Sequence, residues 1–289
     1  MAGGIRLHAK PDGAKTVRRR GKGYPVLFHH YCARSGTAAM SGSVIIAGLG
    51  PGSDTLVTPE VSDALAQATD VVGYIPYVAR VTERPGLTLH PSDNRVELER
   101  AQHALALAET GKTVVVVSSG DPGVFAMASA VFEAMETGPE TWRALDVRVL
   151  PGITAMLAAA AAAGAPLGHD FCAINLSDNL KPWALIEKRL RCAAVGDFAM
   201  AFYNPRSKSR PEGFVKTLAI LNEVCGDDRP VIFARAVSTP EQSIRVVPLS
   251  QCTPEMADMR TVVLVGNAAT RIIDRVGSPI IYTPRSAAG

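Results

Sequence analysis

The stretch that decides the fold of this 289-residue chain is Thr113–Phe125, TVVVVSSGDPGVF. Four consecutive valines followed by two serines are typical of a strand that is buried on both faces, like the inner strands of a parallel sheet. The Gly-Asp-Pro-Gly turn after it predicts a tight loop at the strand's carboxyl end, where open α/β sheets bind their ligands. This loop contains a carboxylate, Asp121, so the ligand that it accepts must tolerate a negative charge.

Strands and helices alternate on the N-terminal side of this stretch and just beyond it. Thr58 and Pro59 indicate a capped helix start. The predicted elements of this half are strands over 43–48, 70–74, 113–117 and 146–152, with helices over 58–68, over 94–109 and after Gly123. The apolar residues predicted to form the buried face of the helix over 94–109 are Val96, Leu98, Ala101, Leu105 and Ala108.

A second alternating set follows an alanine-rich run over 155–166, which predicts a buried helix closed by Gly164. The predicted elements are strands over 171–178, 197–205, 230–237, 242–249 and 261–270, with helices over 182–192 and 212–225. Two adjacent strands joined by Ser-Thr-Pro-Glu-Gln predict a hairpin, so the sheet should be mixed. The fold class is therefore α/β with two domains, 43–152 and 153–289, and a ligand cleft between them.

The composition, 47% hydrophobic and 20% charged, is that of a globular protein. No apolar run approaches the roughly 20 residues of a membrane-spanning helix, so we expect a soluble protein without membrane association. The five cysteines lie 20 or more residues apart and form no Cys-x-x-Cys pair. This spacing favours a reducing, cytoplasmic location and predicts neither a structural zinc nor any other metal site.

The first 42 residues form a basic extension. Residues 1–40 contain eight Lys or Arg and only Asp12 as an acid, a net charge of +7, which leaves −4 for the rest of a chain whose total is +3. The extension lacks an apolar period and contains the histidine pair His29 and His30. We expect it to be disordered, with Met40 as an alternative start, although a functional tail or a targeting segment is the other interpretation.

The glycine-rich loop over 44–60 resembles a dinucleotide fingerprint, but it departs from that pattern. Ser53 stands where the third glycine belongs, and Pro51 removes a backbone donor from the loop. No ribose-binding acid follows the next strand, and no Gly-Lys-Ser/Thr sequence indicates a phosphate-binding P-loop. The loop could also be a tight turn without a ligand.

Asp121 points to a different kind of ligand. A carboxylate at this position would repel a pyrophosphate but suits ribose hydroxyls, an ammonium or a sulfonium. S-adenosylmethionine offers all three groups. The alternative is that Asp121 caps the helix beginning near Gly123.

Two further junctions carry candidate residues. Thr154 begins the alanine-rich helix, either as its cap or with its hydroxyl toward a ligand. After the strand that ends at Tyr203, the residues Arg206, Lys208 and Arg210 form a basic loop without acids until Glu212. The loop is either solvated surface or a binding segment for a polycarboxylate.

In this order and spacing, GLGPGS…LVTPE, SSGDPGVF, LPGITA, AFYNP and PVIFARAVSTPEQ…TVVLVGNAAT resemble the tetrapyrrole methylase family over residues 43–283. The resemblance implies a homodimer of two α/β domains, with S-adenosylmethionine in the cleft and a tetrapyrrole substrate. Ser53, LSDNLKPW and FYNPRS look most like the branch that methylates carbon 17 of the macrocycle and contracts the ring, in cobalamin biosynthesis.

Carried over by motif, the implied cofactor-binding residues are Pro51, Gly120, Asp121, Gly123, Val124, Thr154, Ala155, Tyr203, Ala236 and Thr261. The implied substrate-binding residues are Arg206, Lys208 and Arg210. Ring contraction requires removal of a proton from a substrate hydroxyl. Candidates for this role, by location only, are Ser53, Asp54 and Asp178, and substrate carboxylates could share it. Many relatives place Asp directly after Gly-Pro-Gly, where this chain has Ser53 and then Asp54, so the resemblance does not identify the acid or base.

Other functions stay open at this point. A branch of the family acting on the cobalt-containing analogue is a close rival, and other members methylate RNA or a modified histidine. The basic extension would suit RNA, but the body of the chain is acidic and shows no interleaving of basic and aromatic residues. A nucleotide-binding oxidoreductase or a non-catalytic binding protein is the alternative from another class.

Overall fold

The computed structural model of the protein describes residues 42–94 and 96–286. The predicted basic extension, with His29, His30 and Cys32, lies outside the described residues except for Gly42. Within the described part of the chain, no helix has the length and apolar character that a membrane crossing would need.

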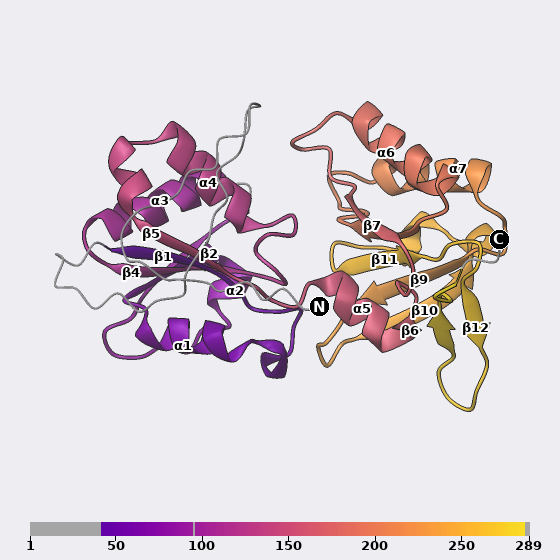
Figure 1. Ribbon diagram of the computed structural model, residues 1–289, viewed down its shortest axis with the longest axis horizontal. Coiled ribbons are helices and arrows are strands. Elements are labelled where there is room, and N and C mark those ends of the chain that lie inside the picture. The colour runs from indigo at the N-terminus through magenta and orange to yellow at the C-terminus, as the bar shows by residue number, and fades with distance from the viewer. Residues whose placement is uncertain (1–41, 95, 287–289) are drawn as a thin grey trace, which may run out of the picture. The chain divides into compact units, whose positions relative to one another are not determined.

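The first sheet has five parallel strands in the order β3-β2-β4-β1-β5 (Figure 1). Its strands are β1 (Ser43–Gly48), β2 (Asp70–Tyr74), β3 (Thr88–Ser92), β4 (Thr113–Ser118) and β5 (Asp146–Leu150). The helices around it are α1 (Pro59–Gln67), α2 (Ile75–Val78), α3 (Glu97–Glu109) and α4 (Met127–Thr137), with 3-10 turns η1 (Asp54–Leu56) and η2 (Glu140–Ala144).

The valine strand β4 lies at the centre of this sheet and is buried on both faces. Val114 and Val116 pack with α3 and α4, whereas Val115 and Val117 pack with α1 on the other face. Figure 1 shows these helices on opposite sides of the sheet. The prediction of a doubly covered parallel strand is confirmed, because successive side chains of a strand point to opposite faces and here both faces are apolar.

Some predicted helix details are confirmed and others are wrong. Thr58 caps α1, since its hydroxyl accepts from Val61 N at 3.3 Å. Leu98 is 45% exposed, not buried, and Arg100 is buried instead. Arg100 can be buried because its guanidinium donates to Ser92 Oγ at 2.7 Å and to Asp93 O at 2.6 Å.

The second sheet also has five strands, in the order β10-β9-β11-β8-β7. Its strands are β7 (Phe171–Asn175), β8 (Ala199–Tyr203), β9 (Pro230–Arg235), β10 (Ser243–Pro248) and β11 (Thr261–Val265). The associated helices are α5 (Ala155–Ala163), α6 (Trp183–Val195) and α7 (Glu212–Val224), with 3-10 turns η3 (Leu249–Gln251) and η4 (Pro254–Met256). β7 pairs with β8 in parallel and the other pairs are antiparallel, so the mixed sheet and the β9–β10 hairpin are confirmed.

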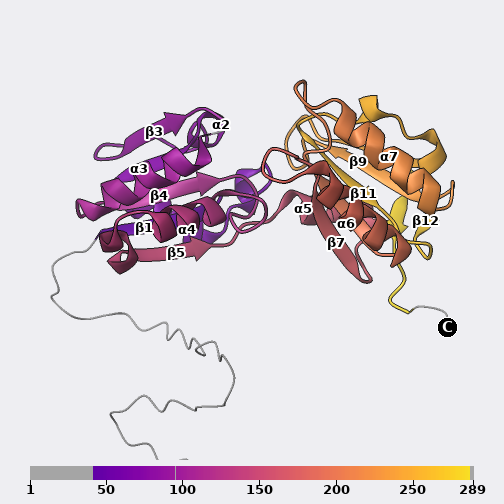
Figure 2. The same ribbon diagram turned by 90° about the horizontal axis from the view of Figure 1, so that it is seen from above.

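Helices cover both faces of the second sheet as well. Apolar residues of α6 and α7 pack on one face, where Phe202 and Phe214 are fully buried. The alanine-rich helix α5 packs on the other face and ends at Gly164, which has φ +133°. Figure 2 shows α6 and α7 side by side in the view from above. The predicted division at residues 152 and 153 stays a prediction, between a first sheet that ends at Leu150 and a second that begins at Phe171.

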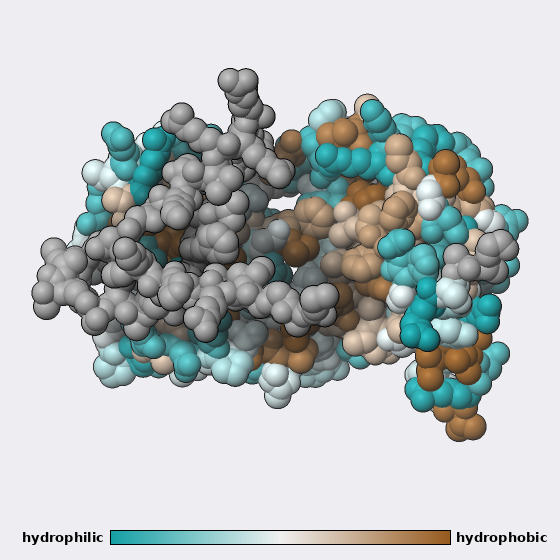
Figure 3. Space-filling model, in the orientation of Figure 1, coloured by the Kyte–Doolittle hydropathy of each residue, from teal (hydrophilic) through white to brown (hydrophobic). Residues whose placement is uncertain are grey.

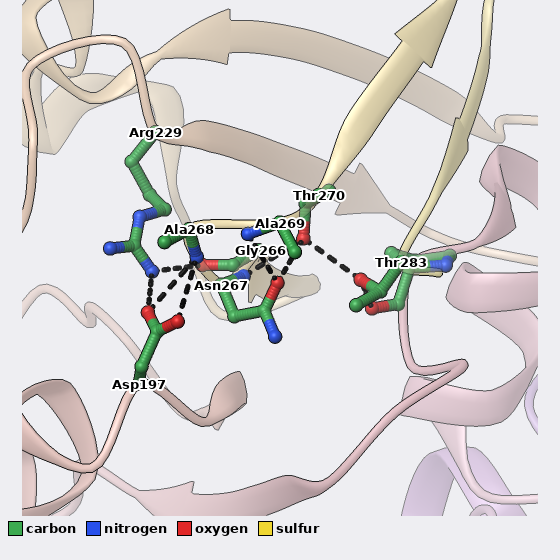
Figure 4. A network of polar contacts seen from close by, with 9 residues as sticks. Asp197, Arg229, Gly266, Asn267, Ala268, Ala269, Thr270 and Thr283 are labelled. Atoms are coloured by element: carbon green, nitrogen blue, oxygen red, sulfur yellow. Dashed lines mark hydrogen bonds and ion pairs between the residues drawn. The ribbon is translucent and has the colours of Figure 1, made fainter. Parts of the chain in front are cut away.

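A small third sheet was not predicted from the sequence. It pairs β12 (Arg271–Ile273), β13 (Ile280–Tyr282) and the two-residue β6 (Gly164–Ala165). Figure 3 shows hydrophobic surface on the β12–β13 hairpin, where Ile272, Ile273 and Val276 are exposed. The polar network in Figure 4 anchors the loop before this hairpin. Asp197 accepts from Arg229 Nη1 at 2.6 Å and from Ala268 N at 2.9 Å.

Candidate functional site

The loops that follow β1 and β4 are joined by their backbones. Gly50 N donates to Gly120 O at 3.2 Å, and Gly120 N donates to Gly50 O at 2.9 Å. Both glycines have left-handed backbones, with φ of +66° and +62°, a conformation that glycine adopts without steric cost. Because β1 and β4 are parallel neighbours, their carboxyl ends bring the two predicted ligand loops together.

A third junction, between β5 and α5, packs against these two loops. A Cβ atom at Gly152 would lie 2.1 Å from Gly120 O and 2.8 Å from Gly48 O. A Cβ atom at Gly48 would lie 2.5 Å from Gly120 O. The three junctions that sequence analysis singled out therefore meet backbone to backbone, at a spacing that excludes any side chain.

Asp121 fixes this arrangement. Its Oδ1 accepts from Gly123 N at 2.8 Å, and its Oδ2 accepts from Gly152 N at 3.1 Å. The helix predicted after Gly123 is present as α4, but it begins at Met127 with Ala126 as its N-cap residue, so the alternative in which Asp121 caps this helix is wrong. Residues 121–125 stay a loop because the carboxylate bonds within the loop and across to the β5–α5 junction.

Thr154 and Tyr203 form the second part of the site. Thr154 is buried and its side chain does not cap α5. Its Oγ1 lies 2.5 Å from Tyr203 Oη, which also accepts from Met156 N at 3.0 Å. The phenol therefore caps the first turn of α5 where the threonine was expected to do so. Thr154 thus stands at the N-cap position, as expected, but the expected capping hydrogen bond of its side chain is absent.

Tyr203 is a neutral group in this position. Burial raises the pKa of its phenol, although the hydrogen bonds with Thr154 and Met156 act in the opposite direction. The ring of Phe125, 48% exposed, meets it edge to face with centroids 5.2 Å apart. Tyr203 thus supplies shape and an aromatic surface rather than a base.

The remaining predicted cofactor residues lie nearby or flank the same loops. Ala236 is buried with φ +48°, and Thr261 donates from Oγ1 to Asp258 Oδ1 at 2.7 Å. The segment after Ala236 reaches the first loop, since a Cβ atom at Gly52 would lie 2.6 Å from Thr239 Cγ2. Pro51, Val124 and Ala155 are half-buried, and Gly123 is exposed.

The three candidate catalytic residues occupy different environments. Ser53 caps η1, with its Oγ accepting from Thr55 N at 3.3 Å. Asp54 is 91% exposed, and its Oδ1 lies 3.6 Å from Arg80 Nη2. Asp178 is exposed in the loop after β7, on the second sheet.

The basic loop differs from its prediction in one respect. Arg206 lies 3.6 Å from Glu255, so the expectation that no acid is near these cations is wrong for Arg206. Glu255 is 49 positions away in sequence and approaches only through the fold. Lys208 is exposed, and Arg210 closes a turn by donating from its backbone N to Ser207 O at 3.1 Å.

Lys181 was missed by sequence analysis. Its Nζ donates to Ser177 O at 2.9 Å in the loop after β7. This loop and the basic loop start from neighbouring strand ends, where Asn204 Nδ2 donates to Asn175 Oδ1 at 3.1 Å. Burial lowers the pKa of Lys181, and so do the charges of Arg189 and Arg210. The loops after β7 and β8 thus form one cationic group, which only the pairing of these two strands reveals.

No group of three His, Cys, Asp or Glu residues that could hold a metal is present in the described part of the chain. A surface hollow of about 480 Å³ is lined by Glu83, Arg84, Leu87, Thr88 and Leu89. Those lining residues include none of the predicted site residues. The candidate site is therefore defined by the contacts between the loops after β1, β4 and β5, and not by this hollow.

Comparisons with known proteins agree with the motifs. The family of Tetrapyrrole (Corrin/Porphyrin) Methylases matches residues 43–253. A precorrin-3B C(17)-methyltransferase from Sinorhizobium sp is 50% identical over 251 residues, 86% of this chain and 99% of the relative. A probable cobalt-factor III C(17)-methyltransferase from Salmonella typhimurium is 37% identical over 247 residues, 83% of this chain and 97% of the relative.

A solved structure is similar at the level of both sequence and fold. The crystal structure of the methyltransferase CobJ is 72% identical, covers 84% of this chain and 100% of its own, and superimposes with a TM-score of 0.81. The glycine junctions, the two sheets and these matches lead to one conclusion: the chain belongs to the tetrapyrrole methylase family.

Proposed function

We propose that this protein transfers a methyl group from S-adenosylmethionine to carbon 17 of precorrin-3B and contracts the ring to precorrin-4, in cobalamin biosynthesis. The observation that carries the proposal is the 50% identity to the precorrin-3B C(17)-methyltransferase over 99% of that relative. The cobalt-factor III relative, at 37%, makes the cobalt-containing macrocycle the second candidate substrate.

The residues of the glycine junctions fit the proposed methyl donor. A Cβ atom at Gly123 would meet only Asp121 Oδ1, at 3.2 Å, so a ligand can approach the exposed side of this loop. Exposed Phe125 and half-buried Val124 add apolar surface. When bound, S-adenosylmethionine supplies an electrophilic methyl group on a cationic sulfur.

The role of the protein in the transfer step is positioning. The sulfonium loses its charge as the methyl group leaves, so an apolar and water-poor site favours the transition state. The Gly120–Val124 loop, Thr154, Ala155 and Tyr203 would hold the donor, with Pro51, Ala236 and Thr261 at its margin. The backbone hydrogen bonds between these loops keep the donor oriented without adjustment during reaction.

The cationic loops would bind the carboxylates of the substrate. Arg206, Lys208 and Arg210 are the predicted ligands, and Lys181 joins them through the neighbouring loop. Arginine binds carboxylates through paired hydrogen bonds, whereas lysine acts as a compact charge.

Asp54 is the best placed of the candidates for accepting the proton of the substrate hydroxyl. Its carboxylate is exposed beside the first glycine loop, whereas Ser53 Oγ is engaged in capping η1. Asp178 lies with the cationic loops, where it would instead limit their positive charge. A homodimer and a cytoplasmic location remain parts of this proposal, based on the family resemblance and on the cysteine spacing.

The test is incubation of the protein with an isotopically labelled methyl donor and one of three acceptors: precorrin-3B, cobalt-factor III or ribosomal RNA. We expect mass spectrometry to find one added methyl group and a contracted ring with precorrin-3B. Transfer to the cobalt substrate alone would select the second candidate, and transfer to RNA alone would overturn the proposal. Light scattering of the same sample measures the oligomeric state.

A further inference from the structure

The loop Leu49–Asp54 is held by an arginine that no motif contains. Arg80 follows α2, and its Nη2 donates to Leu49 O at 2.8 Å while its Nη1 donates to Gly50 O at 3.4 Å. These carbonyls come directly before Pro51 and directly after β1. The guanidinium therefore fixes the point at which the strand turns into the loop.

The same guanidinium also reaches the far end of the loop. Arg80 Nη2 lies 3.6 Å from Asp54 Oδ1, and the side chain of Arg80 is only 22% exposed. A planar guanidinium can serve several acceptors in fixed directions, which a lysine ammonium on a flexible stem does not do. Arg80 thus connects the start of the loop with the carboxylate proposed as proton acceptor.

The segment that carries Arg80 supports the second glycine loop as well. The side chain of Ser119, directly before Gly120, interacts with the Tyr77 phenol of α2 and acts to lower the pKa of that phenol. Burial raises the pKa of Tyr77, so its phenol stays protonated. Because Gly50 and Gly120 bond each other, α2 and the turn after it brace both partners of that pair.

We propose that Arg80 is a positioning residue for methyl transfer: it holds the Leu49–Asp54 loop in register with Gly120 and directs the Asp54 carboxylate toward the substrate. This inference rests on the proposed function for the role of Asp54. The effect of Arg80 on the glycine loops does not depend on the identity of the methyl acceptor. Measurements of cofactor binding can therefore test this effect separately from the role of Asp54.

Arg84 provides a matched control. It lies four positions further along the same segment, and its Nη2 also donates to two backbone carbonyls, Leu65 O at 3.1 Å and Ala68 O at 2.5 Å. Those carbonyls belong to the end of α1 and to the residue after it, not to a glycine loop. Arg80→Ala and Arg84→Ala therefore remove the same kind of contact, but only the first releases the candidate site.

The first experiment is calorimetric titration of S-adenosylhomocysteine into the full-length protein and both variants. We expect Arg80→Ala to weaken binding by roughly tenfold, in line with the loss of about one charge-assisted hydrogen bond, while Arg84→Ala binds like the parent. Arg80→Lys, which keeps the charge, should fold and fall between them. Equal affinity of the Arg80 and Arg84 variants would overturn the proposal.

The second experiment tests the connection to Asp54 by a double-mutant cycle. If Arg80 acts through Asp54, Asp54→Asn should lower kcat less in the Arg80→Lys background than in the parent. Strictly additive losses would overturn that part of the inference. Failure of the parent to methylate any tetrapyrrole would count against the proposed function alone, since the titration would still report on Arg80.

Discussion

The glycine junctions and the basic loop are both proposed to bind ligands, but they are built in opposite ways. At the junctions, Gly48 and Gly152 lie against the carbonyl oxygen of Gly120, and neither of the two has room for a Cβ atom. In the basic loop, Arg206 and Lys208 offer charged side chains, one in an ion pair at the surface and one exposed. If both regions bind ligands, the first would recognise its ligand by shape and the second by charge, so the two should respond differently to substitution and to salt.

The largest loss of stability and of cofactor binding is expected from Gly152→Ala. The new Cβ atom would lie 2.1 Å from Gly120 O, a backbone atom that can move only if the paired loops separate. We expect a loss of about 1–3 kcal/mol in the free energy of unfolding and loss of measurable S-adenosylhomocysteine binding. Urea denaturation and calorimetric titration measure the two quantities.

Gly226→Ala is the control for this substitution. A Cβ atom there would meet only Asp228 Oδ1, at 3.1 Å, in the turn after α7. Normal stability and binding in Gly152→Ala would contradict the close packing of the three junctions, whatever the control does.

Asp121 should produce the next largest effect. Asp121→Ala leaves Gly123 N and Gly152 N without their acceptor, which costs on the order of 1–3 kcal/mol and should lower cofactor affinity roughly 5- to 150-fold. Asp121→Asn keeps one carbonyl oxygen for the two donors, so its affinity should be intermediate. Full recovery in the asparagine variant would show that the bridge to Gly152 is unimportant, and calorimetry with S-adenosylhomocysteine would detect it.

Most of the fold could be predicted from the sequence because its signals are local. The valines of β4 and the alanines of α5 mark buried elements by composition alone. The third sheet was not predicted because β6 has only two residues and pairs with β13, over 110 positions away in the sequence. Leu98 was misplaced because the helical period could not show that the Arg100 side chain would be buried and would donate to Ser92 Oγ and Asp93 O.

The candidate site was predictable where it depends on glycine, and less so where it depends on side-chain direction. The sequence located Asp121 in the glycine loop after the valine strand but could not show that its carboxylate accepts from Gly152 N, 31 positions away. Arg80 and Lys181 belong to no glycine motif, and their importance depends on contacts made after folding. The contact between Glu255 and Arg206 likewise forms only on folding, so the sequence could not show it.

Substitutions in the basic loop should weaken substrate binding moderately and should leave cofactor binding unchanged. Replacing Arg206, Lys208 and Arg210 together by alanine should weaken binding of the tetrapyrrole by roughly tenfold at low salt, since exposed charge pairs contribute about 0.2–1 kcal/mol each. The effect should shrink as salt screens the charges, and S-adenosylhomocysteine affinity should stay unchanged. Absorbance titration at two ionic strengths measures it.

Neutralising the exposed Arg143, Arg271 and Arg275 is the matched control, because it removes the same charge elsewhere on the surface. If both triple variants bound the tetrapyrrole equally well, the basic loop would be solvated surface without a binding role.

The smallest change in tetrapyrrole affinity is expected from Glu255→Gln. Whether binding becomes tighter or weaker shows what Glu255 does to Arg206. Glu255 is 69% exposed and lies 3.6 Å from Arg206, so the pair itself adds little stability. If Arg206 binds a substrate carboxylate, Glu255 competes for it, and removing its charge should tighten tetrapyrrole binding by up to about fivefold at low salt. The gain should vanish in the Arg206→Ala background, because the two residues then have no shared contact.

Glu241→Gln, which removes the partner of Arg260 elsewhere on the surface, should leave affinity unchanged. Weaker binding in Glu255→Gln would mean that the ion pair orients Arg206 rather than competing for it, and the basic loop would then depend on shape as the glycine junctions do.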